Sequence, residues 1–515
     1  MKKYDVVVIG AGNGGLSAAT YLALEGKNVL LLEKHNLPGG CATSFRRGRF
    51  EFEATLHEMC QMGSGKNGEP LGAVRDLLEN RYKLDVDWQP VQEAFSAVVT
   101  DPGGFNVSMP LGVKAFIDEM ERQVPGSRES MTTVMELGRM LYDGVSWLAE
   151  HNNEPSPIAK VEMLMKYHDL MKVVPVSCEE MLKMIGVPEK ARNIYESYWT
   201  YISADSTKMS FAVYTFMTYT YLTQHPWIAK LRSHEIVLAF DKRIRDLGGD
   251  IWYNTEVKKI DVKNGAVCGV ELANGRYIPC DRVISNLMPH VVFDRMIDEK
   301  EVPIRDRKAM NARKLGQSCF TLYLGLDASA EALGLKNYDT FMRYCPSNHV
   351  QYESSDCIET HRDITVTVLT NANQEMADNE KAYIQFSKFY TGDPFENVTE
   401  EDYFKLKERI ANSCIERYEE VTGCDIRNHI EEVVIASPMT WARYLGTPKG
   451  DVYGYEPATW DGMFPRVQSG HKEDYTIKGL RFAGGHGTQM DGYSQAYLSG
   501  AEQARYTLLD IKEGK

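Results

Sequence analysis

The stretch YDVVVIGAGNGGLSAATYLALEGKNVLLLE, residues 4–33, has the order strand, glycine-rich turn, helix and second strand. Its first run, Tyr4–Ile9, is apolar and β-branched, long enough for a buried strand and too short for a core helix. Leu16–Glu25 is rich in Ala and Leu and predicts a helix, which Gly26 ends. Val29–Leu32 predicts a second buried strand. We therefore expect a parallel sheet with a helix packed against it.

Three glycines give the turn the spacing Gly-x-Gly-x-x-Gly. Gly10 permits the tight turn, Gly12 lets the backbone approach a pyrophosphate, and Gly15 allows close packing of helix and strand. The helix N-terminus offers free N–H groups and the positive end of its dipole to phosphates. Glu33 lies 18 residues beyond Gly15 and can accept hydrogen bonds from ribose hydroxyls. The dinucleotide contacts expected in this unit are Gly10, Gly12, Asn13, Gly14, Gly15, Glu33 and Lys34.

A second glycine pair, Gly39–Gly40, stands in the next segment, EKHNLPGGCATSFRRGRFEFEATLH (residues 33–57). This segment resembles the FAD-binding segment of the phytoene desaturase, carotenoid isomerase and retinol saturase superfamily, which is related to the amine oxidases. The resemblance implies an FAD cofactor that runs along the glycine pair. It places Gly40, Cys41, Ala42 and Thr43 along the FAD, with Cys41 as a small spacer, and Leu56 and His57 near the flavin ring.

The resemblance covers nearly the whole chain and is dense again at 233–286 and 437–505. Residues 234–249 predict a helix ended by Gly248–Gly249, and Asn264–Gly265 and Asn274–Gly275 predict hairpin turns. In the superfamily the first strand of this returning segment meets the adenine, which assigns that contact to Val257. Leu480–Ala483 predicts a strand, and a helix follows from Ser494. The resemblance aims that helix at the flavin and adds Gly485, Gly492 and Tyr493 to the expected cofactor contacts.

The expected fold class is α/β: a Rossmann-type FAD-binding domain with an inserted substrate domain made of an antiparallel sheet and a helical cap. The expected division is 1–75, 225–290 and 471–515 for the FAD-binding domain, 76–224 for the helical cap, and 291–470 for the sheet and its helices. Strands are predicted at Cys319–Leu326, Ile364–Thr370, Tyr383–Phe389 and Ile430–Ala436.

Composition excludes several classes of function. The 515 residues carry a net charge of −14, which argues against nucleic acid as a partner. The ten Cys residues show no Cys-x-x-Cys spacing, so no metal site is expected and a reducing cytoplasm is the simplest location. No apolar run is long enough to span a membrane. The stretch KVEMLMKYHDLMKVV (residues 160–174) mixes apolar residues with Lys and predicts either a packed helix or a peripheral membrane contact.

A lipophilic small molecule is the expected substrate. Residues 195–227 are crowded with Tyr, Phe, Trp and Met, as expected for an aromatic core or for the lining of a tunnel for a long hydrocarbon. Tyr198, Trp199 and Tyr219 are the candidate contacts from this stretch. The Pro-x-Gly-Gly turn of the superfamily is replaced here by HPWIAKLRSHE (residues 225–235), so Arg232 either reaches a substrate carboxylate or is a solvated surface residue.

The implied chemistry is hydride exchange between flavin N5 and a C–C or C=C bond of a polyene, retinoid, unsaturated fatty acid or steroid-like molecule, with a proton supplied or removed by the protein. Candidate proton donors are His57, Glu58, His486 and Tyr493, with His57 first because its segment is expected under the flavin. Two alternatives remain open. One is a redox-neutral polyene isomerase that uses reduced FAD. The other is an escort protein of the Rab GDP-dissociation inhibitor type. The sequence does not indicate an electron partner.

Overall fold

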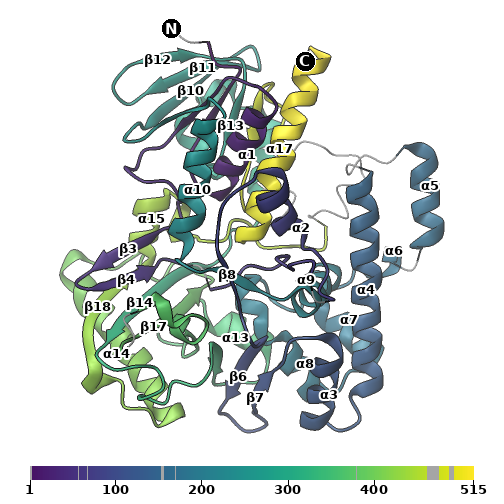
Figure 1. Cartoon of the computed structure of the whole chain (residues 1–515), viewed down its shortest axis with the longest axis vertical. Helices are drawn as coiled ribbons and strands as arrows, with labels where there is room; N and C mark the ends of the chain where they lie inside the picture. The colour runs from purple at the N-terminus through teal and green to yellow at the C-terminus, as the bar shows by residue number, and fades with distance from the viewer. Residues whose placement is uncertain are drawn as a thin grey trace.

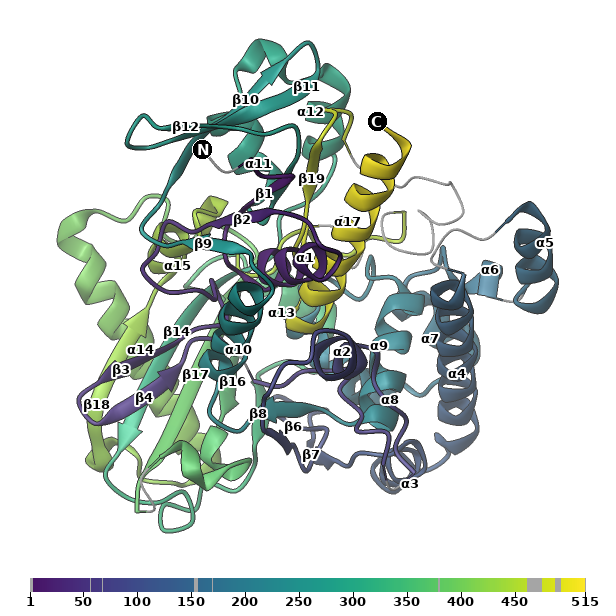
Figure 2. The ribbon, with the colours of Figure 1, turned by 45° about the horizontal axis from the view of Figure 1, so that its top comes forward.

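The structure, a computed structural model, describes residues 3–55, 57–66, 68–151, 156–168, 170–377, 380–460, 475–486 and 492–514. Leu56, an expected cofactor contact, lies outside the described residues. Figures 1 and 2 show three parts: a nucleotide-type domain that holds the first strand and the last helix, a domain built on a large sheet, and a helical cap beside them.

A five-stranded parallel sheet forms the centre of the first part, in the order β19-β13-β1-β2-β9. The strands are β1 Val6–Ile9, β2 Val29–Leu32, β9 Asp250–Trp252, β13 Val283–Ser285 and β19 Leu480–Phe482. The strands predicted at both ends of the chain are therefore confirmed. Because adjacent strands come from distant segments, the sheet is complete only after the chain has returned to it twice.

Both faces of this sheet are covered, which is why its strands are apolar without alternation. On one face Val6, Val8 and Leu31 pack against three helices, α1 (Asn13–Leu24), α10 (Ser233–Asp246) and α17 (Tyr493–Glu513). On the other face lies a three-stranded antiparallel sheet of β10 (Val257–Lys263), β11 (Ala266–Leu272) and β12 (Tyr277–Pro279). Its first turn has φ values of 55° at Asn264 and 75° at Gly265, which confirms the predicted hairpin.

A seven-stranded sheet, in the order β18-β14-β17-β16-β15-β6-β7, forms the second part. Its strands are β6 Phe95–Val99, β7 Asn106–Met109, β14 Ser318–Leu326, β15 Asp339–Arg343, β16 Ile364–Thr367, β17 Ala382–Tyr390 and β18 Ile430–Ala436. The four predicted strands are present. Two features correct the expectation of an antiparallel sheet confined to 291–470: β6 and β7 come from the stretch expected to be helical, and β6 pairs with β15 in parallel. Such long-range pairing leaves no local signal in the sequence.

The cap is formed by helices on one side of the large sheet (Figure 1). They are α3 Val113–Gln123, α4 Arg128–Glu150, α5 Pro157–Lys166, α6 Leu170–Val173, α7 Cys178–Ile185, α8 Glu189–Tyr195 and α9 Phe211–Gln224. Phe116 of α3, Met131 of α4 and Phe211 of α9 share a core with Phe95 of the sheet. Among the described helices none is both long and apolar enough to cross a membrane.

The remaining strands form two pairs, and the long helix α14 packs on the large sheet. The hairpin of β3 (Ser44–Arg47) with β4 (Phe50–Glu53) packs on the large sheet through Phe50 and Phe52, and β5 (Trp88–Pro90) pairs with β8 (Trp227–Ala229). The other helices are α2 Ala73–Arg75, α11 Pro289–Val291, α12 Ile304–Asn311, α13 Asn348–Ser354, α14 Glu400–Thr422 and α15 Pro438–Leu445.

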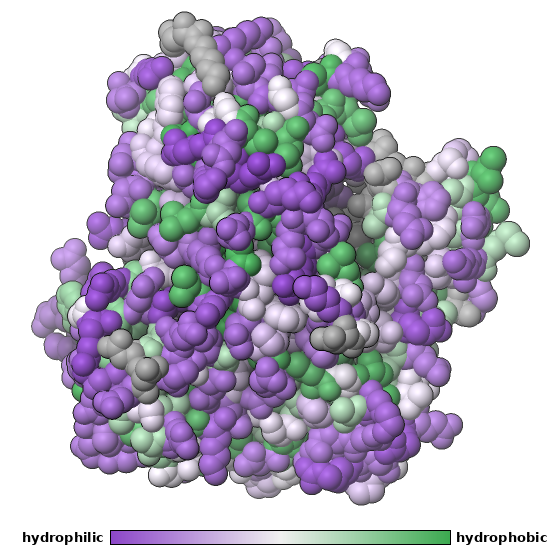
Figure 3. All heavy atoms as spheres, in the orientation of Figure 1, coloured by the Kyte–Doolittle hydropathy of each residue, from purple (hydrophilic) through white to green (hydrophobic). Residues whose placement is uncertain are grey.

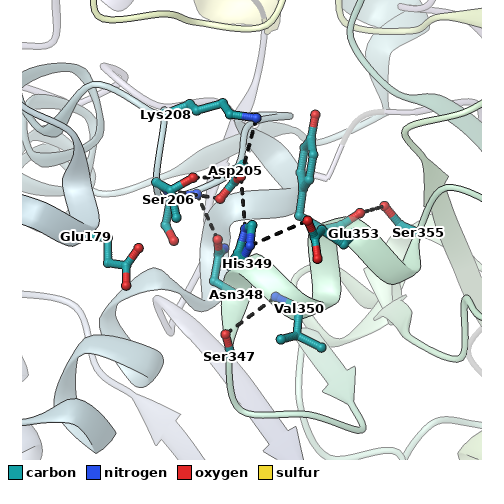
Figure 4. Close-up of polar contacts among 12 residues, drawn as sticks. Glu179, Asp205, Ser206, Lys208, Ser347, Asn348, His349, Val350, Glu353 and Ser355 are labelled. Atoms are coloured by element: carbon teal, nitrogen blue, oxygen red, sulfur yellow. Dashed lines mark hydrogen bonds and ion pairs between the residues drawn. The ribbon is translucent and has the colours of Figure 1, made fainter.

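A polar junction fixes the cap to the sheet domain (Figure 4). Asp205, which precedes α9, is almost fully buried and accepts a hydrogen bond of 3.1 Å from Nδ1 of His349 on α13. The backbone N–H of Ser206 donates to Oδ1 of Asn348 at 2.9 Å. Residues 196–201, which carry Tyr198 and Tyr201, are held to the same helix, because the indole N–H of Trp199 donates to Oε1 of Gln351 at 2.7 Å.

Candidate active site

One cavity of about 1120 Å³ is lined by residues from all three parts of the molecule. Its nucleotide-domain wall includes Gly12, Glu33 and Val257, and its sheet-domain wall includes Gln385. Its cap wall is mostly apolar and consists of Val145, Ala149, Val213, Phe216, Met217, Tyr198, Tyr201 and Tyr221. The cavity exceeds the 300–1,000 Å³ common for drug-sized ligands, which leaves room for a dinucleotide and a second molecule.

The glycine turn, residues 10–15, forms a cradle of backbone atoms, and two of its positions have no room for a side chain. Gly10 has φ of +92°, and a Cβ on Gly14 would lie 2.8 Å from the backbone nitrogen of Gly484. A Cβ on Gly15 would collide with the carbonyl oxygen of Gly10, so Gly15 serves helix–strand packing as expected. Helix α1 has Gly12 as its N-cap and no side-chain cap, which leaves its first N–H groups for a bound anion.

Glu33 is held at the end of β2 by two backbone hydrogen bonds. Its Oε2 accepts from the N–H of Ala11 at 2.7 Å, and its Oε1 accepts from the N–H of His35 at 2.8 Å. The carboxylate is nine-tenths buried and lines the cavity. The bonds fix its orientation and leave lone pairs that can accept from ribose hydroxyls.

Asn286 joins the cradle to the C-terminal strand, a role that the sequence analysis missed. Its Oδ1 accepts from the N–H of Gly15 at 2.7 Å, and its Nδ2 donates to the carbonyl oxygen of Ala483 at 3.3 Å. A polar residue directly after a parallel strand, at its carboxyl end, was the available signal.

The N-terminus of α17 forms the opposite wall. Gly492, with φ of +93°, is its N-cap and makes no side-chain cap, so the first N–H groups of this helix are not capped from within it. The hydroxyl of Tyr493 donates to the carbonyl oxygen of Cys41 at 2.9 Å and lies 2.8 Å from Oγ1 of Thr55. These bonds bring the two ends of the chain together at one site.

The structure brings most of the expected cofactor residues to this cavity. Those that line it are Gly10, Gly12, Asn13, Gly14, Glu33, Lys34, Gly40, Cys41, His57, Val257, Gly485, Gly492 and Tyr493. Gly15 lies beneath the turn. Ala42 and Thr43 do not line the cavity, which corrects the expectation for both: Ala42 is fully buried in the domain core, and the side chain of Thr43 turns to the carbonyl oxygen of Ser44.

Glu58 has the properties of a proton donor. Its Oε1 accepts from the hydroxyl of Tyr198 and lies 3.3 Å from the hydroxyl of Tyr221, which donates its proton to the carbonyl oxygen of Ala94 at 2.9 Å. Its Oε2 is buried and has no hydrogen-bond partner among the described residues. Desolvation raises the pKa of this carboxyl from 4.5 to about 7. A large share of the molecules therefore carry a proton on Glu58 near neutral pH.

His57 is less suited to donate a proton, although the sequence favours it. Its Nδ1 contacts the hydroxyl of Tyr201, and its Nε2 lies 3.2 Å from the amide nitrogen of Gln385. Tyr201 in turn donates to Oδ1 of Asp339 at 3.1 Å. All three bonds form when His57 is neutral with its proton on Nδ1. Burial lowers the pKa of His57 to about 3, so the ring stays neutral and both nitrogens stay engaged.

Of the four candidate substrate contacts only Tyr198 lines the cavity. Trp199 is buried in the core, where its indole N–H donates to Oε1 of Gln351 at 2.7 Å. Tyr219 packs on Tyr142 of α4 instead. The guanidinium of Arg232 is buried, contacts the carbonyl oxygen of Met376 and lies 3.7 Å from Oε2 of Glu51. Arg232 is therefore neither a substrate contact nor a solvated surface residue.

The other two candidate proton donors also lie at the cavity. His486 is buried and packs edge-on against Phe482. Tyr493 is tied to Cys41 and Thr55, and burial raises its pKa well above 10. Residues around the site that the sequence did not single out include Tyr201, Asp339 and Gln385, which meet only through the three-dimensional fold.

The site fits a dinucleotide. Gly10, Gly12 and Gly40 line the cavity without side chains, and Oδ1 of Asn13 is buried without a hydrogen-bond partner in the described structure. An orphan acceptor of this kind is costly unless a ligand or water satisfies it. The α1 N-terminus and the Glu33 carboxylate provide the phosphate and ribose contacts that such a molecule needs.

Comparison with known proteins supports this assignment. Residues 8–71 match the family model for an NAD(P)-binding Rossmann-like domain. The chain is 24% identical over 480 residues to all-trans-retinol 13,14-reductase of Danio rerio, covering 87% of this chain and 77% of that protein. It is 24% identical over 465 residues to chloroplastic prolycopene isomerase of Daucus carota, covering 88% of this chain and 72% of that protein. The similarity to the retinol saturase and carotenoid isomerase superfamily is thus confirmed.

A solved structure shows the same fold over the whole chain. A putrescine oxidase variant matches with a TM-score of 0.65 at 13% sequence identity, covering 100% of this chain and 99% of that one. The similarity to amine oxidases expected from the sequence therefore extends to the complete architecture, including the cap and the large sheet.

Proposed function

We propose that this protein is an FAD-dependent oxidoreductase that exchanges a hydride with a carbon–carbon double bond of a lipophilic polyene. The observation that carries the proposal is a single cavity that joins a dinucleotide cradle to an apolar channel, with a proton-bearing carboxyl in its wall. Thr55 bonds to the start of α17, while Glu58, three residues later, bonds to tyrosines of the cap. The carboxyl thus lies where the cofactor end of the cavity meets the substrate end.

FAD is favoured over a nicotinamide cofactor because two helix N-termini, α1 and α17, border the cavity from opposite ends of the chain. The α1 N-terminus with Gly12 and Gly14 would hold the pyrophosphate, Glu33 the ribose and Val257 the adenine. The partial positive charge at the start of α17 favours negative charge on the flavin. When bound, FAD supplies reversible uptake and release of a hydride.

The chain itself orients the polyene, excludes water and moves a proton. Val213, Phe216 and Met217 of α9 form an apolar wall that suits a long hydrocarbon. Glu58 lines the cavity beside the apolar wall, and the hydroxyl of Tyr198 holds its Oε1. In saturation the protonated carboxyl gives its proton to the carbon that does not receive the hydride. The tyrosine and His57 network keeps this carboxyl desolvated and fixed.

Saturation is favoured as the direction because a relative named as a retinol reductase covers most of the chain and because a pKa raised to about 7 leaves part of the Glu58 carboxyls protonated near neutral pH. A second candidate is redox-neutral isomerisation of a polyene, which the relative named prolycopene isomerase supports. Both would use the same cofactor and cavity.

Product analysis tests the proposal. The purified protein, with its flavin reduced under anaerobic conditions, is incubated with all-trans-retinol or with a cis-configured carotene, and the products are analysed by mass spectrometry. A product heavier by two hydrogens supports saturation, and a product of unchanged mass but new retention time supports isomerisation. If a protein with reducible bound flavin changes neither substrate, the proposed substrate class is wrong.

A further inference from the structure

Helix α5 (Pro157–Lys166) presents an apolar stripe to solvent. Ile158, Val161 and Met165, at spacing i, i+3 and i+7, are 83%, 57% and 77% exposed. The opposite face of the helix is anchored, since Ala159 and the following Tyr167 are buried against Leu141 and Leu148 of α4. Figure 3 shows hydrophobic side chains at the end of this projecting part of the cap, which Figure 1 labels α5.

Charges border the stripe in the way that a lipid surface favours. Lys160 and Lys166 are exposed and flank the apolar residues, with Glu162 the one acidic residue of α5, so the helix carries two positive charges and one negative. This net positive charge contrasts with −14 for the whole chain. Lys side chains beside an apolar stripe can extend to lipid phosphates while the stripe enters the acyl region.

The helix that carries the stripe is anchored to two helices that line the cavity, α4 and α9. Val145 and Ala149, in the last turns of α4, line the cavity. Phe216 of α9 lines the cavity and also packs against the cluster of Leu141, Leu148, Ala159 and Tyr167 that anchors α5. Residues of α4 and α9 therefore lie between α5 and the cavity.

We propose that α5 docks this protein on the surface of an anionic lipid bilayer. Ile158, Val161 and Met165 enter the boundary between headgroups and acyl chains, and Lys160 and Lys166 meet the phosphates. Docking places the apolar arm of the cavity close to the membrane, so a hydrophobic substrate reaches the site without crossing water. Only this last step rests on the proposed function, because the stripe and its charges are independent of the chemistry.

Vesicle flotation of the full-length protein tests the docking. The probes are vesicles of phosphatidylcholine alone and of phosphatidylcholine with phosphatidylglycerol. The triple variant Ile158→Ser, Val161→Ser, Met165→Ser removes the stripe. Phe404→Ser is the matched control, because Phe404 is 73% exposed on α14 in the sheet domain. Circular dichroism and melting curves confirm that the variants fold.

We expect the wild type and Phe404→Ser to float with anionic vesicles and the triple variant to bind them at least about tenfold more weakly. Lys160→Glu with Lys166→Glu weakens binding to anionic vesicles and leaves the weaker binding to neutral ones unchanged. Equal binding by the triple variant and the wild type overturns the proposal. The proposal is also overturned if the triple variant shows less self-association in sedimentation but floats with vesicles as the wild type does.

A further arm separates this result from failure of the proposed function. Turnover of substrate delivered in detergent does not need the membrane, so it is unchanged in the triple variant if the enzyme assignment holds. Flotation needs no flavin, so it persists in protein depleted of cofactor. Loss of flotation with intact detergent turnover in the triple variant supports docking, whereas flotation without turnover in the wild type contradicts only the proposed function.

Discussion

Two neighbouring residues, His57 and Glu58, have opposite acid–base behaviour because burial acts with opposite sign on a base and on an acid. Burial lowers the pKa of the imidazole to about 3 and raises that of the carboxyl to about 7, since each group resists being charged. The imidazole is therefore a fixed hydrogen-bonding group. The carboxyl is the group whose proton can move near neutral pH.

Replacing Glu58 with Gln tests its role as proton donor. The amide keeps the shape, the bond from Tyr198 and the contact with Tyr221 but cannot act as an acid, so we expect turnover to fall by about 10²-fold or more. Because saturation needs the protonated acid, the wild-type rate should fall as the pH rises through about 7, and this step should vanish in the variant. The measurement is single-turnover flavin oxidation at several pH values.

The matched control is Glu69→Gln. Glu69 also accepts bonds near the cap, from Ser64 at 2.8 Å, but does not line the cavity. An unchanged rate in Glu58→Gln, or a pH step that persists in it, would exclude Glu58 as the donor.

Glu33 is the residue that fixes the nucleotide sugar in the proposed complex. Glu33→Gln keeps one acceptor for a backbone N–H and removes the charge, so we expect the affinity for FAD to fall by about 10- to 100-fold. Glu25→Gln is the control, because Glu25 belongs to the same unit but pairs with Arg81 at the surface. Fluorescence titration of the cofactor-free protein gives the dissociation constants for FAD. Equal dissociation constants for the two variants would show that the ribose does not bind at Glu33.

At the scale of single residues, the sequence predicted contacts made within a motif and missed those made across the fold. The glycines and Glu33 were assigned because their spacing along one strand–turn–helix unit carries the information. Ala42 and Thr43 were misplaced because neighbours in a loop need not face the same side. Trp199 and Arg232 were misassigned because aromatic or charged character does not reveal which side chains are packed into a core.

At the scale of elements, α1 and α17 form the support of the site, since they pack side by side and both begin at the cavity (Figure 2). Gly500 is the close-packed point: a Cβ there would collide with the carbonyl oxygen of Gly14 and would lie 2.8 Å from Cβ of Ser17. The contact joins the first motif of the sequence to its last helix.

Gly500→Val therefore should push the two helices apart. We expect a fall in melting temperature of several degrees, with overpacking costs of about 1–3 kcal/mol, and weaker retention of the cofactor. Lys512→Val is the control, since Lys512 is exposed near the end of the same helix and a Val there has a similar effect on helix propensity. Equal melting temperatures and flavin contents in the two variants would show that this packing does not support the site.

Elements with strong local patterns were predicted well. Strands β2 and β18, for example, have the same bounds as the apolar runs from which they were predicted. Strand β15 was not predicted, and β6 and β7 were assigned to a helical region. These strands are short, and the pairing of β6 with β15, which places β6 and β7 in the large sheet, joins segments more than two hundred residues apart in the chain.

At the scale of the whole molecule, the chain builds its nucleotide domain from three separate segments and inserts the cap and the large sheet between them (Figure 1). The resemblance to a known superfamily predicted this arrangement, because it covers both ends and the returning middle. Neither motifs nor composition predicted the shape of the cavity, because its walls come from all three parts of the molecule.

The absorption spectrum of the purified protein tests the central claim most directly. If both ends of the chain enclose one flavin dinucleotide, the protein is yellow, its visible band bleaches on reduction, and acid releases one FAD per chain. A protein that stays colourless after refolding with FAD would contradict the assignment of the cavity and everything proposed for it.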